Sequence, residues 1–266
     1  MNPESDLSVA LVVAHPDDDA YGMAGTVALH ALNPNFRYLL VHATDGEAGE
    51  IAPGIEATTE TLGELRRRED EAAWQAHGRP PERHEWLRYP DGGLSAVPFE
   101  DLAERISAIL RAERPRVVCT FGPDGITGHP DHIAVGRATD AAFTRLREEG
   151  VPGMERLLHG GLRESTFLRW NTARREHGLD PWNPGQIYHL RPVPDQAIGV
   201  EVDTRSVAAQ VLAGLLEHRS QRHVLFARTL SREQQLRVLG RESYVMAWPV
   251  RTVGEPLLAD IFEGLG

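Results

Sequence analysis

Short apolar runs alternate with stretches of helical periodicity through the first half of the chain. The runs are rich in valine and leucine and predict buried strands at 7–14, 36–43, 86–87 and 116–121. Apolar residues spaced three and four apart predict helices at 23–32, 61–77, 99–112 and 131–148. This alternation is typical of a mostly parallel sheet with helices on both faces, so we expect an α/β fold, a Rossmann-like sandwich of three layers.

The second half of the chain is less regular between 151 and 194. We interpret this segment as an excursion that covers the active site of a single domain spanning 1–266, because one α/β domain can reach about 250 residues. Regular structure is then expected to return at five places: strands at 187–190, 198–202 and 244–248, and helices at 204–218 and 231–239.

Two polar clusters follow buried strands of the predicted sheet. Ala14-His15-Pro16-Asp17-Asp18-Asp19 comes directly after the first strand, and Gly128-His129-Pro130-Asp131-His132 follows the strand that ends at Phe121. Ligands of open α/β sheets bind at the carboxyl ends of the strands. Each cluster contains a His-Pro-Asp unit, and this repetition indicates a metal site.

An imidazole, a carboxylate three residues later and a second imidazole from another loop form a ligand set for a divalent metal. His15, Asp18 and His132 supply such a set, and three protein ligands leave a coordination position open, as in catalytic zinc sites. Asp17, beside the ligand Asp18, is the candidate base that takes a proton from water. The same donors also suit Fe²⁺ or another divalent metal. Helix capping and backbone hydrogen bonding are the competing structural interpretations of each cluster.

Composition and charge narrow the function classes. All 28 basic residues are arginines, and the absence of lysine excludes Schiff-base lysine chemistry, a pyridoxal phosphate anchor and a P-loop. The net charge of −11 opposes binding to nucleic acid or to an anionic membrane, so we expect a small-molecule substrate. The first apolar run is too short to span a membrane, which needs roughly 18 residues, and we expect a cytoplasmic protein. The one cysteine, Cys119, lies in an apolar run and is expected to be a buried, inert thiol.

The two clusters resemble the signatures of a known family. The first looks like the AHPDDE motif of the LmbE-like, or PIG-L, family of zinc-dependent N-deacetylases, and the second matches its GHPDH motif. Further matches occur in the family's order along most of the chain: Thr44-Asp45-Gly46-Glu47, Arg66 with Glu69, Tyr89-Pro90-Asp91-Gly92, Arg114-Pro115-Arg116-Val117-Val118 and His218-Arg219-Ser220-Gln221.

The resemblance implies a role for each residue of the two motifs. His15, Asp18 and His132 become zinc ligands and Asp17 the general base, in agreement with the assignment from residue chemistry alone. The resemblance adds His129, which would stabilise the tetrahedral oxyanion or protonate the leaving amine, with Asp131 hydrogen-bonded to it. An imidazolium held by a carboxylate can place positive charge where negative charge develops.

Two positions depart from the family's pattern. Asp19 stands where the first motif usually ends in glutamate, so a contact made by the longer side chain is lost or bridged by water. Thr127 stands where some members carry a tyrosine that hydrogen-bonds the oxyanion. His129 and the metal must then carry more of the stabilisation, or a tyrosine from elsewhere must serve.

The substrate-binding residues follow less directly from the sequence. Arg66 and Asp91 match positions in the family's polar pocket loops, and His218 shares a predicted helix face with Gln221. The run from Arg66 to Glu71 is equally an ordinary charged helix face. Trp170 and Trp182 would cover a sugar or pack in the core.

The sequence therefore predicts a metal-dependent hydrolase that removes an N-acyl group, most simply acetyl, from an amino-sugar-containing small molecule. One alternative is an amidase that cleaves a mycothiol-type S-conjugate or acts on a natural-product intermediate. A different class is a non-catalytic protein that binds a metal or sugar on the same fold, although Asp17 and His129 are not needed for binding alone. Homo-oligomerisation is left open by the sequence.

Overall fold

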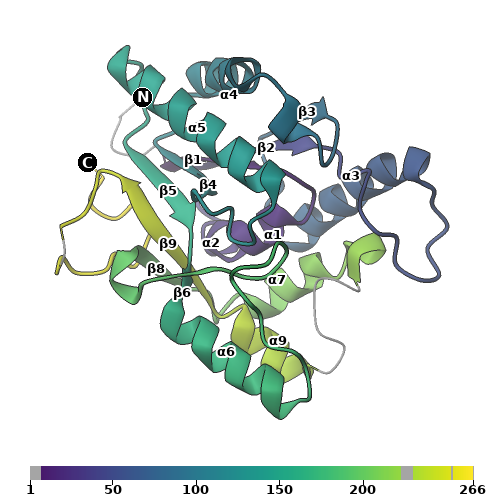
Figure 1. The fold of residues 1–266 in the computed structure, drawn as a ribbon. Coiled ribbons are helices and arrows are strands. Elements are labelled where there is room, and N and C mark those ends of the chain that lie inside the picture. Colours follow the sequence, from purple (N-terminus) through teal and green to yellow (C-terminus); the bar gives the residue numbers. More distant parts are fainter. Residues whose placement is uncertain (1–6, 223–229, 253, 266) are drawn as a thin grey trace. The chain divides into compact units, whose positions relative to one another are not determined.

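The structure, a computed structural model, describes residues 7–222, 230–252 and 254–265 (Figure 1). The chain divides into two units, each built from two separate stretches of sequence. The first unit comprises Met1–Ala96 and Asp203–Glu242, and the second comprises Val97–Val202 and Ser243–Leu265. The single domain over 1–266 stays a prediction.

The first unit contains three parallel strands. In the order β3-β2-β1, they are β3 (Arg83–Tyr89), β2 (Phe36–Thr44) and β1 (Leu7–Val13). Nearly every side chain of β1 and β2 is buried, as expected for strands covered on both faces. The strands expected at 7–14 and 36–43 are therefore present, and the short third strand is longer than its two apolar residues indicated.

Helices of the first unit pack mainly around α7. They are α1 (Asp18–Gly22), α2 (Ala24–Leu29), α3 (Thr59–Ala76), α7 (Ala208–Leu215) and α9 (Arg232–Val238), with 3-10 turns η2 (Leu94–Ala96) and η4 (Arg219–Gln221). Helix α7 contacts α1, α2, α3 and α9. A capping box between Thr58 and Thr61 satisfies the first backbone groups of α3. The buried face of α3 carries charged residues as well as apolar ones, namely Leu62, Arg66, Glu69, Asp70, Ala73 and Trp74.

The second unit has a mixed arrangement of strands. In the order β4-β5-β9-β8, they are β4 (Val117–Phe121), β5 (Arg156–Gly160), β9 (Arg241–Trp248) and β8 (Ile198–Asp203). Strands β4 and β5 are parallel, whereas β5 and β9 are antiparallel. A separate two-stranded ladder joins β6 (Leu162–Arg163) to β7 (Pro192–Val193).

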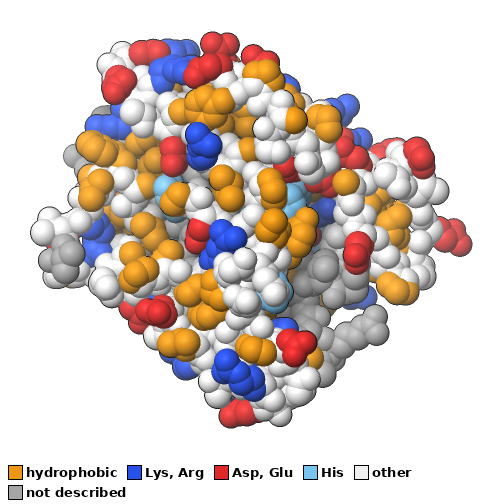
Figure 2. Space-filling view, in the orientation of Figure 1, with side chains coloured by type: hydrophobic (Ala, Val, Ile, Leu, Met, Phe, Trp, Pro, Cys, Tyr) orange, Lys and Arg blue, Asp and Glu red, His pale blue; other side chains and the backbone are white. Residues whose placement is uncertain are grey.

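The second unit's two longest helices pack against each other. They are α4 (Phe99–Glu113) and α5 (Pro130–Glu148), and α5 also contacts β4. Helix α6 (Glu164–Glu176) follows β6, and a 3-10 turn η3 (Asp195–Ala197) precedes β8. Cys119 in β4 is buried and forms no disulfide. Acidic, basic and apolar side chains are interspersed over the face of the molecule in Figure 2.

Several expectations for the second half need correction. The segment 151–194 is more regular than predicted, since it contains β5 and α6. The expected strand at 187–190 is wrong: this stretch is irregular, and Ile187 and Tyr188 are 51% and 71% exposed. The helix expected over 204–218 is shorter, as Ala208–Leu215. Among the described helices, none combines the length and the apolarity that a membrane span requires.

Candidate active site

The first polar motif lies in the loop that joins β1 to α1. Strand β1 ends at Val13, and α1 begins at Asp18, whose backbone N–H donates to the His15 carbonyl at 3.2 Å. Asp17 has a φ of 108°, in the left-handed region that non-glycine residues rarely adopt. Such strain persists only where the surroundings fix the backbone, and it is common at functional sites.

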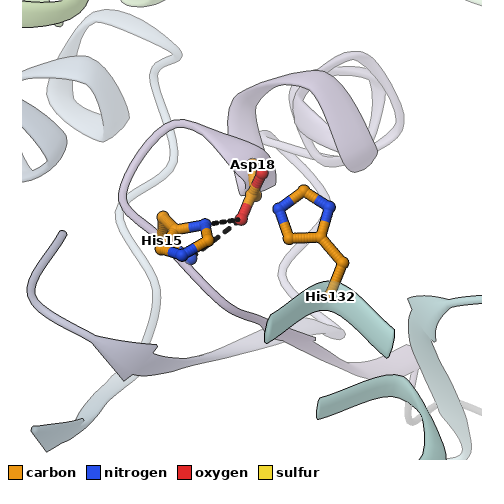
Figure 3. A group of neighbouring side chains, drawn as sticks. All are labelled: His15, Asp18 and His132. Atoms are coloured by element: carbon orange, nitrogen blue, oxygen red, sulfur yellow. Dashed lines mark hydrogen bonds and ion pairs between the residues drawn. The ribbon is translucent and has the colours of Figure 1, made fainter. Parts of the chain in front are cut away.

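The imidazole of His15 is held at both nitrogens. Its Nδ1 lies 3.2 Å from Oδ2 of Asp18 (Figure 3), and its Nε2 lies 2.9 Å from Oδ1 of Asp91. Asp91 also accepts a hydrogen bond from the Ala48 backbone N–H at 2.9 Å. Burial alone would raise the pKa of Asp91, but the hydrogen bond and charge of His15 outweigh it and keep the pKa below its ordinary value.

An ionised Asp91 selects one tautomer of His15. The Asp91 carboxylate holds the proton on Nε2 of His15. The lone pair of Nδ1 is then on the side of the ring where the Asp18 carboxylate lies. A carboxylate on the outer nitrogen of a histidine is the usual support of a metal-ligating imidazole. The pair formed by His15 and Asp18 therefore fits a metal. Asp91 contacts His15, and its predicted contact with substrate stays a prediction.

Asp17 is a largely buried carboxylate next to a buried guanidinium. Burial raises its pKa from the ordinary value to about 7, although the charge of Arg66 acts in the opposite direction. One Nη of Arg66 lies 3.2 Å from Oδ2 of Asp17. Asp17 is thus a carboxylate whose proton affinity lies close to neutral pH.

Arg66 is only 4% exposed and donates to two backbone carbonyls besides Asp17. The acceptors are the carbonyl oxygens of Gly46 at 2.8 Å and Pro16 at 2.5 Å. In contrast, Arg68 on the same helix is exposed and paired with Glu64. The charged run on α3 is therefore only in part a solvated face, and the substrate contact predicted for Arg66 stays a prediction.

Asp19, which replaces the usual glutamate, is fully buried and makes direct contacts. Its Oδ1 accepts from the Asp17 backbone N–H at 3.1 Å and lies 3.3 Å from Nε2 of His42, and its Oδ2 accepts from the indole of Trp74. Burial would raise the pKa of Asp19, but the hydrogen bond and charge of His42 hold it below its ordinary range. The shorter side chain therefore anchors the loop directly to the interior of the first unit.

His218 is also buried in the first unit, at 1% exposure. Burial lowers its pKa to about 4, so the ring is neutral near pH 7. Its neighbour Ser220 donates to Glu69 from both its backbone N–H and its hydroxyl. Gln221 donates to the Glu50 carbonyl at 2.9 Å. The side chain of His218 lies in the interior, and its contact with substrate stays a prediction.

The second polar motif lies in the loop that leads into α5. His129 is the N-cap of this helix, and its Nδ1 accepts a hydrogen bond from the Asp131 backbone N–H at 3.1 Å. His132, one turn into the helix, donates from Nδ1 to the Gly125 carbonyl at 3.0 Å. Its ring is stacked on Phe121 at 4.1 Å between centroids. The contact with Gly125 puts the proton of the neutral ring on Nδ1 and the lone pair on Nε2.

Tyr188 is a candidate site residue that the sequence did not single out. Its ring stands edge-on to His129, with 5.3 Å between the ring centroids, and its backbone N–H donates to the Thr127 carbonyl at 2.9 Å. The φ of Tyr188 is 67°, another strained backbone position. Tyr188 is distant in sequence from the motif, so no local spacing could have identified it.

Arg191 also connects the segment that contains Tyr188 to the loop that contains His129. Its backbone N–H donates to the Ile126 carbonyl at 2.7 Å, and its guanidinium lies so close to Gly128 that a Cβ there would collide with it. Glycine at 128 is therefore needed both for its φ of 73° and for this approach. The segment with Tyr188 is tied to the loop with His129.

Of the two tryptophans named from the sequence, Trp170 lies on α6 and Trp182 lies in the segment after it. Trp170 and Trp182 have ring centroids 6.2 Å apart, and the Arg174 guanidinium lies over Trp182 at 4.4 Å. Asn171 binds the backbone of Trp182 through both its amide nitrogen and its amide oxygen. These contacts explain the pair as local packing.

Comparison with known proteins places these residues in a family. Residues 10–143 match the family model described as GlcNAc-PI de-N-acetylase, PIG-L. A Saccharopolyspora erythraea protein named 1D-myo-inositol 2-acetamido-2-deoxy-alpha-D-glucopyranoside deacetylase 2 is 34% identical over 239 residues, covering 79% of this chain and 82% of the relative. A Tsukamurella paurometabola protein, named 1D-myo-inositol 2-acetamido-2-deoxy-alpha-D-glucopyranoside deacetylase, is 30% identical. The match covers 96% of this chain and 98% of the relative.

A solved structure agrees at the level of the fold. N,N'-diacetylchitobiose deacetylase from Pyrococcus horikoshii matches with a TM-score of 0.60 at 22% identity, covering 92% of this chain and 86% of that one. The predicted α/β fold is thus confirmed. On the family model and the two relatives, the chain belongs to the GlcNAc-PI de-N-acetylase, or PIG-L, family and is an N-deacetylase.

Proposed function

We propose that this deacetylase hydrolyses the acetamide of a glucosaminyl-inositol, releasing acetate and the free amine. The names of the two relatives support this substrate, since both are deacetylases of 2-acetamido-2-deoxy-glucopyranosyl inositol. The observation that carries the chemistry is the His15 and Asp18 pair, supported by Asp91 and next to Asp17, whose pKa is near neutrality.

The metal ligands proposed are His15, Asp18 and His132 (Figure 3). Each imidazole has one nitrogen committed to a protein acceptor, Asp91 or the Gly125 carbonyl, so each offers the other as a neutral donor. Two imidazoles and one carboxylate suit zinc with an open position, and also Fe²⁺. When bound, the metal would lower the pKa of water and polarise the amide carbonyl.

Asp17 is proposed as the base that takes the proton of the attacking water. A base is most effective when its pKa lies near the working pH, because it is then both deprotonated and basic enough. Burial provides this tuning, and Arg66 keeps the carboxylate oriented.

His129 is proposed to stabilise the oxyanion. Because Nδ1 of His129 accepts from the Asp131 backbone, the proton of the neutral ring lies on Nε2. That N–H can donate to the oxygen on which negative charge develops as water adds to the amide. Tyr188 lies against the same ring and is proposed to supply the hydroxyl that position 127 lacks.

Free-amine release tests the substrate directly. We expect kcat/KM for 1D-myo-inositol 2-acetamido-2-deoxy-α-D-glucopyranoside to exceed that for a mycothiol-type S-conjugate amide by at least about tenfold, or about 1.4 kcal/mol in transition-state binding. Preference for the S-conjugate would favour the amidase alternative. Tight binding of the sugar without any amine release would identify a non-catalytic binding protein.

Asp17→Asn removes the base while preserving its shape. We expect kcat to fall by roughly 10²- to 10⁴-fold, because general-base catalysis contributes about that much. Metal content, measured on the same preparation, should stay at the wild-type level. Glu56→Gln, the same exchange at an exposed position, is the control. A variant at Asp17 that retains near-wild-type turnover would show that another group takes the proton.

Asp91→Asn tests the support of His15. An amide no longer fixes the proton on Nε2 as a carboxylate does, so we expect the affinity for zinc to fall by about 10- to 100-fold. Competition with a chromophoric chelator measures this affinity, and excess zinc should restore most of the activity. If the affinity is unchanged and KM for the sugar rises instead, Asp91 acts as a substrate residue.

Tyr188→Phe tests whether the neighbouring phenol assists His129. Loss of one hydroxyl that donates to the oxyanion should lower kcat by about 10²-fold with little change in KM. Thr127→Val removes the hydroxyl at the family's usual position and should leave kcat close to wild type. Equal, small effects of both substitutions would mean that His129 needs no hydroxyl from either residue.

A further inference from the structure

Three metal-type donors gather in the first unit outside the proposed active site. His42 comes from β2, His84 from β3 and Asp70 from α3, and their ligand atoms lie within 4.8 Å of one another. We propose that these residues bind a second divalent cation, which links the edge strand of the first unit to its longest helix.

The local fold brings the three side chains to one face of the sheet. Strands β2 and β3 are parallel, with Leu40 opposite His84 and His42 opposite Trp86. Residues two apart on a strand share a face, so His42 and His84 point to the same side. The buried face of α3, which includes Asp70 and Trp74, covers this side.

The spacing of the donor atoms suits a small cation. Nε2 of His84 lies 3.5 Å from Oδ2 of Asp70 and 2.9 Å from Nδ1 of His42. Two ligand atoms at about 2.1 Å from a tetrahedral ion lie about 3.4 Å apart. The first distance already matches, and the second needs to open by about 0.5 Å.

Asp70 gives a second argument for a cation. The residue is fully buried, and its carboxylate oxygens lie 3.5 Å from Nε2 of His84 and 3.9 Å from Nε2 of His42, without a close hydrogen bond among the described residues. Burial, and next the charge of Asp19, raise the pKa of Asp70 well above its ordinary value. A buried carboxylate without a close hydrogen bond is costly, and a coordinated cation lowers that cost. Asp19 differs, since it already accepts hydrogen bonds from Trp74 and the Asp17 backbone.

The two imidazoles are suited to be ligands. Burial lowers the pKa of His84 to about 3, so its ring is neutral and its lone pair is available near pH 7. Trp86 is stacked on both rings, with 4.4 Å between centroids in each case, and fixes their planes. The side chain of His84 is 15% exposed, which gives an ion a route from the sheet edge. Two imidazoles and a carboxylate suit Zn²⁺, Fe²⁺ or Mn²⁺.

The competing arrangement has no cation. His42 and His84 would then share a hydrogen bond, and Asp70 would be protonated within the same network. The two arrangements differ in the number of metal ions that the folded protein binds. Metal counting therefore decides between them.

Equilibrium dialysis against Zn²⁺, followed by metal analysis, tests the proposal. Metal-depleted wild-type protein should take up two equivalents per chain, and His84→Gln should take up one and keep its deacetylase activity. His15→Ala should also bind one equivalent, and the double variant none. His77→Gln, which removes another buried histidine of the first unit that is not in the trio, should still bind two.

A second readout uses the wild-type chain and does not depend on the folding of a His84 variant. Co²⁺ bound beside Trp86 should quench part of the tryptophan fluorescence with a stoichiometry separate from that of the first equivalent, and Trp86→Phe should remove that step. A single equivalent in wild type, lost in His15→Ala and retained in His84→Gln, would overturn the second site. Failure of the proposed function is distinct, because it appears as absent amine release whatever the metal count.

Discussion

The contacts of one buried guanidinium set the geometry of the loop between β1 and α1. Arg66 extends from α3 to the loop after β1 and the loop after β2, where the Pro16 and Gly46 carbonyls accept its protons. The same group lies beside Asp17 and opposes the rise in pKa that burial causes. A cation at this position stabilises the loop and also limits how basic the carboxylate becomes. Lysine, with a single ammonium, could not reach three acceptors in this planar arrangement.

Part of the acidic composition consists of buried carboxylates in the same unit as Arg66. Asp17, Asp19 and Asp70 are carboxylates of the first unit that are largely or fully removed from solvent, and their pKa values are shifted in different directions. Asp19 is kept ionised by its histidine neighbour, whereas Asp70 holds its proton more strongly. Carboxylates in one interior with such different environments can serve different purposes: anchoring, proton transfer and, as proposed, cation binding.

Much of the fold and of the two motifs could be predicted from the sequence because continuous apolar runs identify buried strands. The runs that became β1, β2 and β4 are of this kind. One polar motif follows β1 directly, and the other begins seven residues after the end of β4. Strand β5 was missed because Arg156–Gly160 contains only two strongly apolar residues. Helix α6 was missed because its buried residues, Phe167 and Asn171, give almost no apolar stripe.

Contacts between residues distant in sequence could not be predicted. Tyr188 reaches His129 through a strained loop, and nothing in its local pattern marks it. The charged run on α3 was open to interpretation as a solvated face, yet Arg66, Glu69 and Asp70 are buried while Arg68 is exposed. Periodicity reports which face of a helix is apolar, but it does not report charges that are buried against each other.

We propose that ligands from the two motifs bind one metal. X-ray absorption of the His84→Gln protein, loaded with one equivalent of zinc, measures the ligands of that ion. We expect nitrogen and oxygen ligands at about 2.0–2.1 Å with two imidazoles, and one imidazole fewer after His132→Ala. A zinc ion with a single imidazole before that substitution, or with ligands unchanged by it, would show that the two motifs do not share the metal.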